Sequence, residues 1–72
     1  MEKEVLLKKL GERIRDIRKE KGITQVQLAH VIGKDQQSIQ RLEGGNVNPS
    51  LYYLHQIATG LDVSLEVICR DI

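Results

Sequence analysis

One short segment of the chain gathers polar side chains at helical spacing: Gln36, Gln37, Gln40 and Arg41. On a helix that turns about 100° per residue, these four side chains project within an arc of about 140°. The aliphatic residues Ile39 and Leu42 project from the opposite side. A glutamine amide can bond adenine N6 and N7 together, and an arginine guanidinium can bond guanine O6 and N7. The polar face is therefore suited to reading the edges of nucleotide bases.

A helix face that is simply solvated is the plainest alternative for this segment. Such faces are more commonly built from Glu and Lys, which are good helix formers. The face described above carries three amides and one guanidinium, and it carries no acidic residue. This composition favours base recognition over plain solvation.

Helices are the elements expected to position this face, because every apolar stretch follows a helical period and no alternating pattern competes. The first helix is predicted from about Glu4 to Lys21. The later helices each follow a residue that caps helix N-termini well, namely Thr24, Asp35, Ser50 and Ser64. Gln27 completes a capping box with Thr24. Gly22, Gly33 and the pair Gly44–Gly45 are expected to end the first three helices.

The predicted fold is a compact all-α domain of five helices that occupies residues 1–72 as one unit. Residues 24–43 form two helices of about eight residues joined by a turn of three or four residues, which is the helix-turn-helix arrangement. Ala29 is small where these two helices must approach each other. The core is expected to be aliphatic, because the only aromatic residues are two tyrosines. Its predicted members are Leu6, Leu10, Ile14, Ile17, Leu28, Ala29, Ile32, Ile39, Leu42, Leu51, Leu54, Ile57, Ala58 and Leu61.

Several function classes find no support in the sequence. Ser38 and Ser64 have no adjacent histidine to activate them, and His30 and His55 have no ligand partners at metal-binding spacing. We therefore expect no catalysis, no metal and no cofactor. No apolar run approaches the roughly 20 residues that span a bilayer, and one unpaired cysteine fits a reducing compartment. The sequence predicts a soluble, cytoplasmic, nucleoid-associated protein that contacts no membrane, in which Cys69 is a small packing residue rather than a redox sensor.

Basic residues are concentrated between Lys8 and Lys21, where seven of them accompany three acidic residues, although the net charge of the chain is only +1. The main interpretation is a solvated helix face with ion pairs four residues apart, around Glu12, Arg15 and Asp16. Phosphate contact by one or two of the basic side chains is a secondary interpretation.

From Leu10 to Ile68 the chain resembles the phage-repressor and Cro-like helix-turn-helix family, also called the XRE family. The resemblance rests on these residues: Ile14-Arg15, Ile17-Arg18, Gly22, Thr24-Gln25, Leu28-Ala29, Ile32-Gly33, Ser38-Ile39, Leu42-Glu43, Gly45, Asn48-Pro49-Ser50-Leu51, Leu54, Ile57-Ala58 and Val63-Ser64. It implies a lambda-repressor-like fold in which the third helix enters the major groove of DNA.

The resemblance also implies roles for individual residues. Gln36, Gln37 and Arg41 match positions that contact base edges, and Gln40 shares their face. Phosphate contacts are implied for Gln25, Lys34, Asn46, Asn48, Ser50 and Tyr52. For Tyr52, an exposed side chain without a DNA contact is an equally favoured interpretation. Arg18 and Glu43 match a buried ion pair that ties the first helix to the end of the third.

The chain departs from the family pattern after the fourth helix, where it reads Gly60-Leu61-Asp62-Val63. Gly60 should weaken the helix, and Asp62 must take a left-handed position usually occupied by glycine. This region often forms the dimer contact in the family. We predict a dimer surface at Leu61, Val63 and residues 69–72.

The function expected from these observations is sequence-specific binding to double-stranded DNA by a homodimer on a palindromic operator, as a transcription regulator and repressor. The alternative from a different class is a protein-interaction module with the same fold, such as an antitoxin that binds a toxin or an adaptor. Binding to structured RNA is disfavoured, because few aromatic residues can stack on bases.

Overall fold

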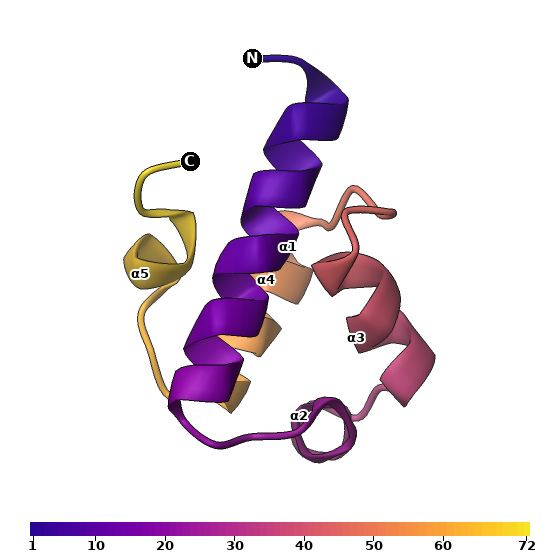
Figure 1. The fold of residues 1–72 in the computed structure, drawn as a ribbon. Helices are drawn as coiled ribbons and strands as arrows, with labels where there is room; N and C mark the ends of the chain where they lie inside the picture. Colours follow the sequence, from indigo (N-terminus) through magenta and orange to yellow (C-terminus); the bar gives the residue numbers. More distant parts are fainter.

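The computed structural model describes residues 1–72 as five α-helices without a β-strand. The helices are α1 (Lys3–Glu20), α2 (Gln25–Val31), α3 (Gln36–Glu43), α4 (Leu51–Gly60) and α5 (Leu65–Cys69). The long helix α1 runs through the middle of the view, with α3 on one side of it and α5 on the other (Figure 1). The all-α, five-helix fold predicted from the sequence is confirmed, and the bounds of α1 differ from the prediction by one residue at each end.

Each of the four later helices begins at a side chain that accepts a hydrogen bond from the helix backbone. Thr24 Oγ1 accepts from the Gln27 amide at 3.0 Å, and Gln27 Oε1 accepts from the Thr24 amide at 2.8 Å. This reciprocal pair is the predicted capping box. The caps of α4 and α5 are the predicted Ser50 and Ser64.

The N-cap of α3 fixes the start of the polar segment singled out in the sequence. The carboxylate of Asp35 accepts from the backbone amide and from the hydroxyl of Ser38, each at 2.8 Å. These hydrogen bonds favour the charged carboxylate and hold the pKa of Asp35 below its usual value. The preceding Gly33 has a φ of +70°, which glycine adopts without steric penalty, and it ends α2 as predicted.

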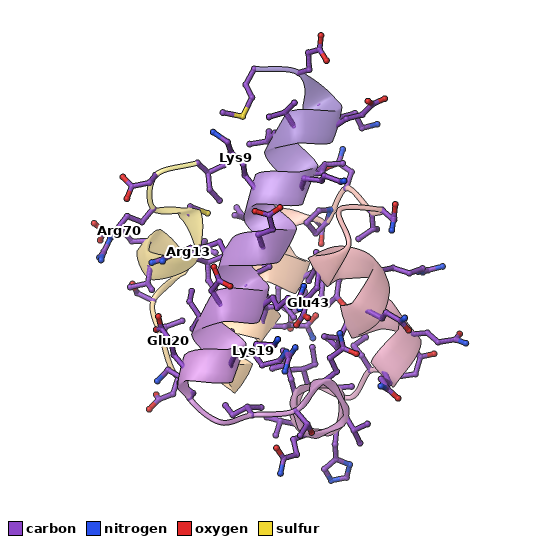
Figure 2. The ribbon with its side chains drawn as sticks, in the orientation of Figure 1. Lys9, Arg13, Lys19, Glu20, Glu43 and Arg70 are labelled. Carbon is purple, nitrogen blue, oxygen red and sulfur yellow. The ribbon has the colours of Figure 1, made fainter.

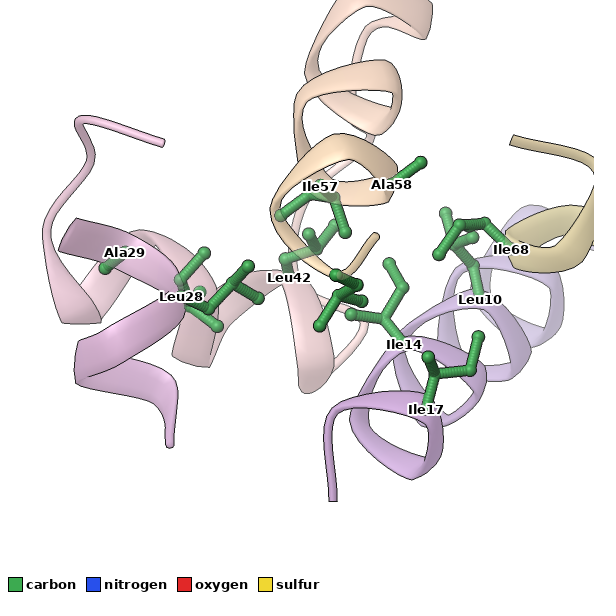
Figure 3. Packing of buried hydrophobic residues seen from close by; sticks show 11 residues of the cluster. Leu10, Ile14, Ile17, Leu28, Ala29, Leu42, Ile57, Ala58 and Ile68 are labelled. Carbon is green, nitrogen blue, oxygen red and sulfur yellow. The ribbon is translucent and has the colours of Figure 1, made fainter. Parts of the chain in front are cut away.

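The hydrophobic core is built from all five helices. Its eleven buried members are Leu10, Ile14, Ile17, Leu28, Ala29, Ile39, Leu42, Ile57, Ala58, Leu61 and Ile68. They converge between α1, the α2–α3 pair and α4, with Ile68 closing the side at α5 (Figure 3). This one cluster holds the two helices of the helix-turn-helix against the rest of the chain.

Two residues predicted for the core are exposed, and two others, Ile32 and Leu54, are only partly buried and pack against it. Leu6 is 39% exposed and Leu51 is 69% exposed. Leu6 lies in the first turns of α1, which project beyond the other helices (Figure 1), and Leu51 is the first residue of α4. Leu6 and Leu51 each follow an apolar helical stripe without being buried.

Two glycines within helices allow close packing between elements. A Cβ at Gly11 in α1 would lie 2.6 Å from the carbonyl oxygen of Leu42 and would also overlap the Glu43 carbonyl. A Cβ at Gly60 in α4 would lie 2.8 Å from side-chain atoms of both Ile32 and Leu28. Gly60 therefore lets α4 pack closely against Leu28 and Ile32, in addition to weakening the helix as expected from the sequence. Gly11 lets α1 approach the end of α3.

The left-handed conformation expected for Asp62 after α4 is present in the structure. Asp62 has a φ of +57° and occupies the left-handed conformation without being a glycine. None of the five helices combines the length and the apolar character needed to cross a lipid bilayer.

Candidate nucleic-acid interface

The polar side of α3 is open to solvent over its whole length. The four side chains predicted to read bases are all exposed, namely Gln36, Gln37, Gln40 and Arg41. On the other side of the same helix, Ile39 is 0% exposed and Leu42 is 1% exposed. The helix is therefore held by its aliphatic side and offers amides and a guanidinium outward.

A buried ion pair anchors the C-terminal end of α3. Arg18 Nε lies 2.6 Å from Glu43 Oε2, and Arg18 Nη2 donates to Glu43 Oε1 at 3.0 Å. The third guanidinium nitrogen, Nη1, donates to the carbonyl of Ile23 at 2.8 Å. The side chains are only 9% and 4% exposed, and Figure 2 shows Glu43 between α1 and α3. This is the pair that the family resemblance implied, and its hydrogen bonds raise the pKa of Arg18.

Gln25, the first residue of α2, connects this ion pair to the exposed face of α3. Its Nε2 donates to Glu43 Oε1 at 3.0 Å. Its Oε1 accepts from Gln36 Nε2 at 3.4 Å, which is a long hydrogen bond. The side chain of Gln25 is half-buried, so its amide is fixed by protein partners at both ends.

The remaining residues predicted to contact phosphates lie in the segments that flank α3 in sequence, and all of them are exposed: Lys34, Asn46, Asn48, Ser50 and Tyr52. Lys34 follows Gly33 in the turn before α3, and the other four lie between α3 and the first turn of α4. The Ser50 hydroxyl already accepts the Tyr53 amide at 3.0 Å as the N-cap of α4, which leaves its proton free to donate.

Tyr53 is a residue beside this region that the sequence did not single out. The Lys34 ammonium lies 5.5 Å from the centre of its ring, within the range of a cation–π contact. Its hydroxyl is buried without a hydrogen-bond partner, and burial raises the pKa of that hydroxyl. The cation–π contact orients Lys34, and no local sequence pattern predicted it.

The structure changes the prediction for the dimer surface and for Cys69. Leu61 is 0% exposed within its own chain, so it is unavailable to a partner and the prediction is wrong at this position. Leu61 is the C-cap of α4 and packs in the hydrophobic core, as its place on the apolar stripe of α4 predicted. Cys69 is exposed, which differs from the packing role expected from the sequence.

The ion pairs predicted along α1 are also absent. Arg18–Glu43 is the single salt bridge in the structure, and no pair forms among Glu12, Arg15 and Asp16. Arg13 instead uses its Nε to donate to the carbonyl of Val67 at 3.0 Å, which ties α1 to α5.

Comparisons with known proteins agree with the fold and with the segment described above. The family described as Helix-turn-helix, HTH_3, matches residues 14–68. An uncharacterized HTH-type transcriptional regulator of Methanothermobacter thermautotrophicus is 48% identical over 48 residues, which cover 67% of this chain and 70% of the relative. The immunity repressor protein of Bacillus phage phi105 is 37% identical over 62 residues, covering 86% of this chain and 43% of the relative.

A solved structure extends the comparison to a complex. It is a restriction-modification controller protein, determined as a tetramer with its natural 35-base-pair operator. It is 38% identical in sequence, covers 88% of this chain and 83% of its own, and superposes with a TM-score of 0.81. The helix-turn-helix resemblance found in the sequence is confirmed, while the roles of individual residues stay predictions.

Proposed function

The chain belongs to the helix-turn-helix (HTH_3, XRE-type) family of DNA-binding transcription regulators, and on this premise we propose that it binds double-stranded DNA sequence-specifically through α3 in the major groove. The observation that carries the proposal is the division of α3 into two sides. Ile39 and Leu42 are buried, whereas the amides and the guanidinium on the opposite side are exposed. A rigid helix that offers such groups outward suits the donor and acceptor pattern of the major groove.

In this proposal Gln36, Gln37, Gln40 and Arg41 contact base edges, and Arg41 makes the paired contact to a guanine. A helix N-terminus favours anions, because its free amides and its dipole point toward them. The start of α4 therefore supports phosphate binding, together with the exposed side chains that flank α3: Lys34, Asn46, Asn48, Ser50 and Tyr52. Gln25 has a second Nε2 proton that is not used by Glu43 and can serve a phosphate.

A homodimer on a palindromic operator completes the proposal. A domain of this size makes few contacts with DNA, and two copies that read half-sites one helical turn apart, about 34–36 Å, multiply the affinity. The controller protein named above is a tetramer on its operator, and the phage relative is a repressor. We extend both properties to this chain as expectations: it assembles on DNA and represses transcription by occupying its operator.

The test compares Arg41→Ala with Arg70→Ala, a matched loss of one exposed arginine from the end of the chain near α5 (Figure 2). Binding to operator variants should show that Arg41→Ala costs about 1–3 kcal/mol and relaxes the preference at one base pair. Arg70→Ala should leave the preference at every base pair unchanged, because Arg70 lies at the predicted dimer surface and outside α3. Equal weakening of Arg41→Ala on all sequences would assign Arg41 to a phosphate instead.

A second variant tests the phosphate contacts. Lys34→Ala should weaken binding on every sequence alike, and it should reduce the slope of log affinity against log salt by about 1. A loss confined to the preferred operator would contradict this role.

A further inference from the structure

We propose that Lys8 of α1 binds a phosphate of the DNA backbone beside the loop that joins α3 to α4, residues 44–50. The inference rests on the function proposed above and adds to it a binding residue from α1, a helix outside the helix-turn-helix. The ligand of Lys8 is a backbone phosphodiester, so this contact adds affinity on every DNA sequence and adds no preference between bases.

The packing of Gly45 places the side chain of Lys8 against this loop. A Cβ at Gly45 would lie 2.9 Å from Cγ of Lys8 and 3.0 Å from its Cα. The loop backbone therefore touches α1 at Lys8, and Figure 1 shows the loop beside the N-terminal half of α1. Gly45 has a φ of +76°, which glycine adopts freely. The loop thus confines the start of the Lys8 side chain, while the residue stays exposed to solvent.

The charge of Lys8 is not paired within the protein. Lys8 forms no ion pair, although Glu4 lies four residues earlier, at a spacing that favours pairs on a helix. Glu4 lies about one helical turn nearer to the start of the chain. The ammonium of Lys8 is therefore available to an anion that approaches over the loop. Lys8 borders an open hollow between α1 and the loop, which is lined by Glu4, Val5, Lys8, Gly44, Gly45 and Asn46.

The loop itself carries no cation. No lysine or arginine occurs between Arg41 and Arg70, so the side chains proposed to contact phosphates after α3 are all neutral. On the other flank of α3, Lys34 supplies a positive charge in the turn that precedes the helix. Neutralisation of phosphates by cations provides most of the sequence-independent affinity for DNA. Lys8 gives the loop side of α3 the charge that the loop sequence does not carry.

A structural role is the alternative interpretation of Lys8. A cation near the last turn of a helix stabilises the helix dipole, and Lys8 touches Gly45, just beyond the end of α3. Such a role changes the stability of the fold and leaves the salt dependence of DNA binding unaltered. The salt dependence therefore distinguishes the two roles.

The test compares Lys8→Met with Lys9→Met in binding to a mixed-sequence duplex, at salt concentrations from about 50 to about 200 mM. Methionine keeps an unbranched side chain against Gly45 and removes the ammonium. Lys9 is the next residue and is also exposed. It lies on the side of α1 toward α5 (Figure 2), where it lines a different hollow with Arg13 and Arg70. Light scattering in the same buffers gives the oligomeric state, and slopes are compared between samples of equal state.

Lys8→Met should reduce the magnitude of the slope of log affinity against log salt by about 0.9 for each bound copy of the chain. The affinity advantage of wild type should accordingly shrink about 3.5-fold per copy across this range of salt. Lys9→Met should keep the wild-type slope. Lys8→Arg should keep it too, because arginine retains the cation.

Three results would overturn the inference and leave the proposed function intact. The first is a wild-type slope in Lys8→Met, and the second is an equal reduction in Lys8→Met and Lys9→Met. The third is a reduction in Lys8→Arg as large as that in Lys8→Met, which would assign the loss to packing at Gly45. A wild type that binds no duplex at any salt concentration would instead contradict the proposed function.

Chemical footprinting of the wild-type protein tests the same contact without a variant. Lysine acetylation should modify Lys8 several-fold more slowly in the complex with this duplex than in the free protein, because the ammonium is then covered by phosphate. Equal modification of Lys8 with and without the duplex, at a duplex concentration that saturates binding, would overturn the inference.

Discussion

The inner and outer sides of α3 differ in how far the rest of the chain constrains them. On the inner side, Ile39 and Leu42 are buried, Gly11 of α1 contacts the end of the helix, and Glu43 is bonded to Arg18. On the outer side, one long hydrogen bond from Gln36 is the single side-chain bond to another element. The eight residues of α3 therefore belong to two different environments.

From this difference we expect stability and base preference to be carried by different side chains of the same helix. Substitution on the outer side changes what is offered to a ligand and leaves the core packing intact, while substitution on the inner side removes buried contacts. Gln25 and Glu43 are where the two environments meet. Substitutions on the two sides should therefore have separable effects on stability and on DNA binding.

Arg18→Met should have the largest effect, because it leaves the Glu43 carboxylate nearly buried without its partner. Removing one member of a buried pair costs about 3–5 kcal/mol, which is a large share of the stability of a domain this size. Chemical denaturation measures the loss. The double variant Arg18→Met/Glu43→Met should regain most of it, because no charge then remains buried. If the double variant were as unstable as Arg18→Met, an unpaired charge would not be the cause.

Gly11→Ala should have the next largest effect, because its methyl group would meet backbone atoms of α3 rather than a flexible side chain. Overpacking of this kind costs about 1–3 kcal/mol. Gly44→Ala is the matched control, since Gly44 has a φ of −79° and a Cβ there mainly approaches the mobile end of Asn46. Thermal unfolding should separate the two variants clearly, and equal losses would contradict the close approach of α1 to α3.

Asp62→Gly should stabilise the domain without changing the side chains on the outer side of α3. The left-handed conformation of Asp62 is unfavourable for a residue with a Cβ, and glycine adopts it freely. The gain should be about 0.5–1 kcal/mol, with DNA affinity unchanged. A change in base preference in this variant would show that the two sides of α3 are not separable.

Asp35→Asn should give the smallest effect, visible as a change in the pH dependence of stability. The folded-state pKa of Asp35 is lowered by its bonds to Ser38, so the carboxylate stabilises the fold at neutral pH. The usual pKa of an aspartate is about 4, and the folded-state pKa of Asp35 lies below it. The stabilising contribution is therefore lost as the pH falls through this lowered pKa. Asparagine keeps the cap without titrating. Thermal unfolding between pH 7 and pH 2 should show the wild-type advantage disappearing in acid, and a constant difference would contradict this role.

The helix starts and the glycine turn before α3 were predictable from the sequence because they are local. Thr24 with Gln27 and Asp35 with Ser38 each act across three residues, and Gly33 acts at its own position. The outward polar side of α3 was predictable for the same reason, since the helical period alone divides glutamines from aliphatic residues.

Contacts between distant elements were the part that the residue pattern did not reveal, except for the Arg18–Glu43 pair, which the family resemblance implied. A helical stripe identifies an apolar side, but it does not say where the covering helix ends, which is why Leu6 and Leu51 were assigned to the core. The role of Gly11 depends on the backbone of α3, about thirty residues later in the chain. One signal for it was present: Gly11 lies on the α1 side that also carries Ile14 and Arg18, three and seven residues on.

Selection of bound duplexes from a random library tests the claim that the outer side of α3 recognises DNA sequence. We expect enrichment of a palindromic site whose half-sites are centred about 10 base pairs apart, with adenine and guanine at the positions read by Gln36 and Arg41. Binding that enriches no sequence at any salt concentration would contradict the claim.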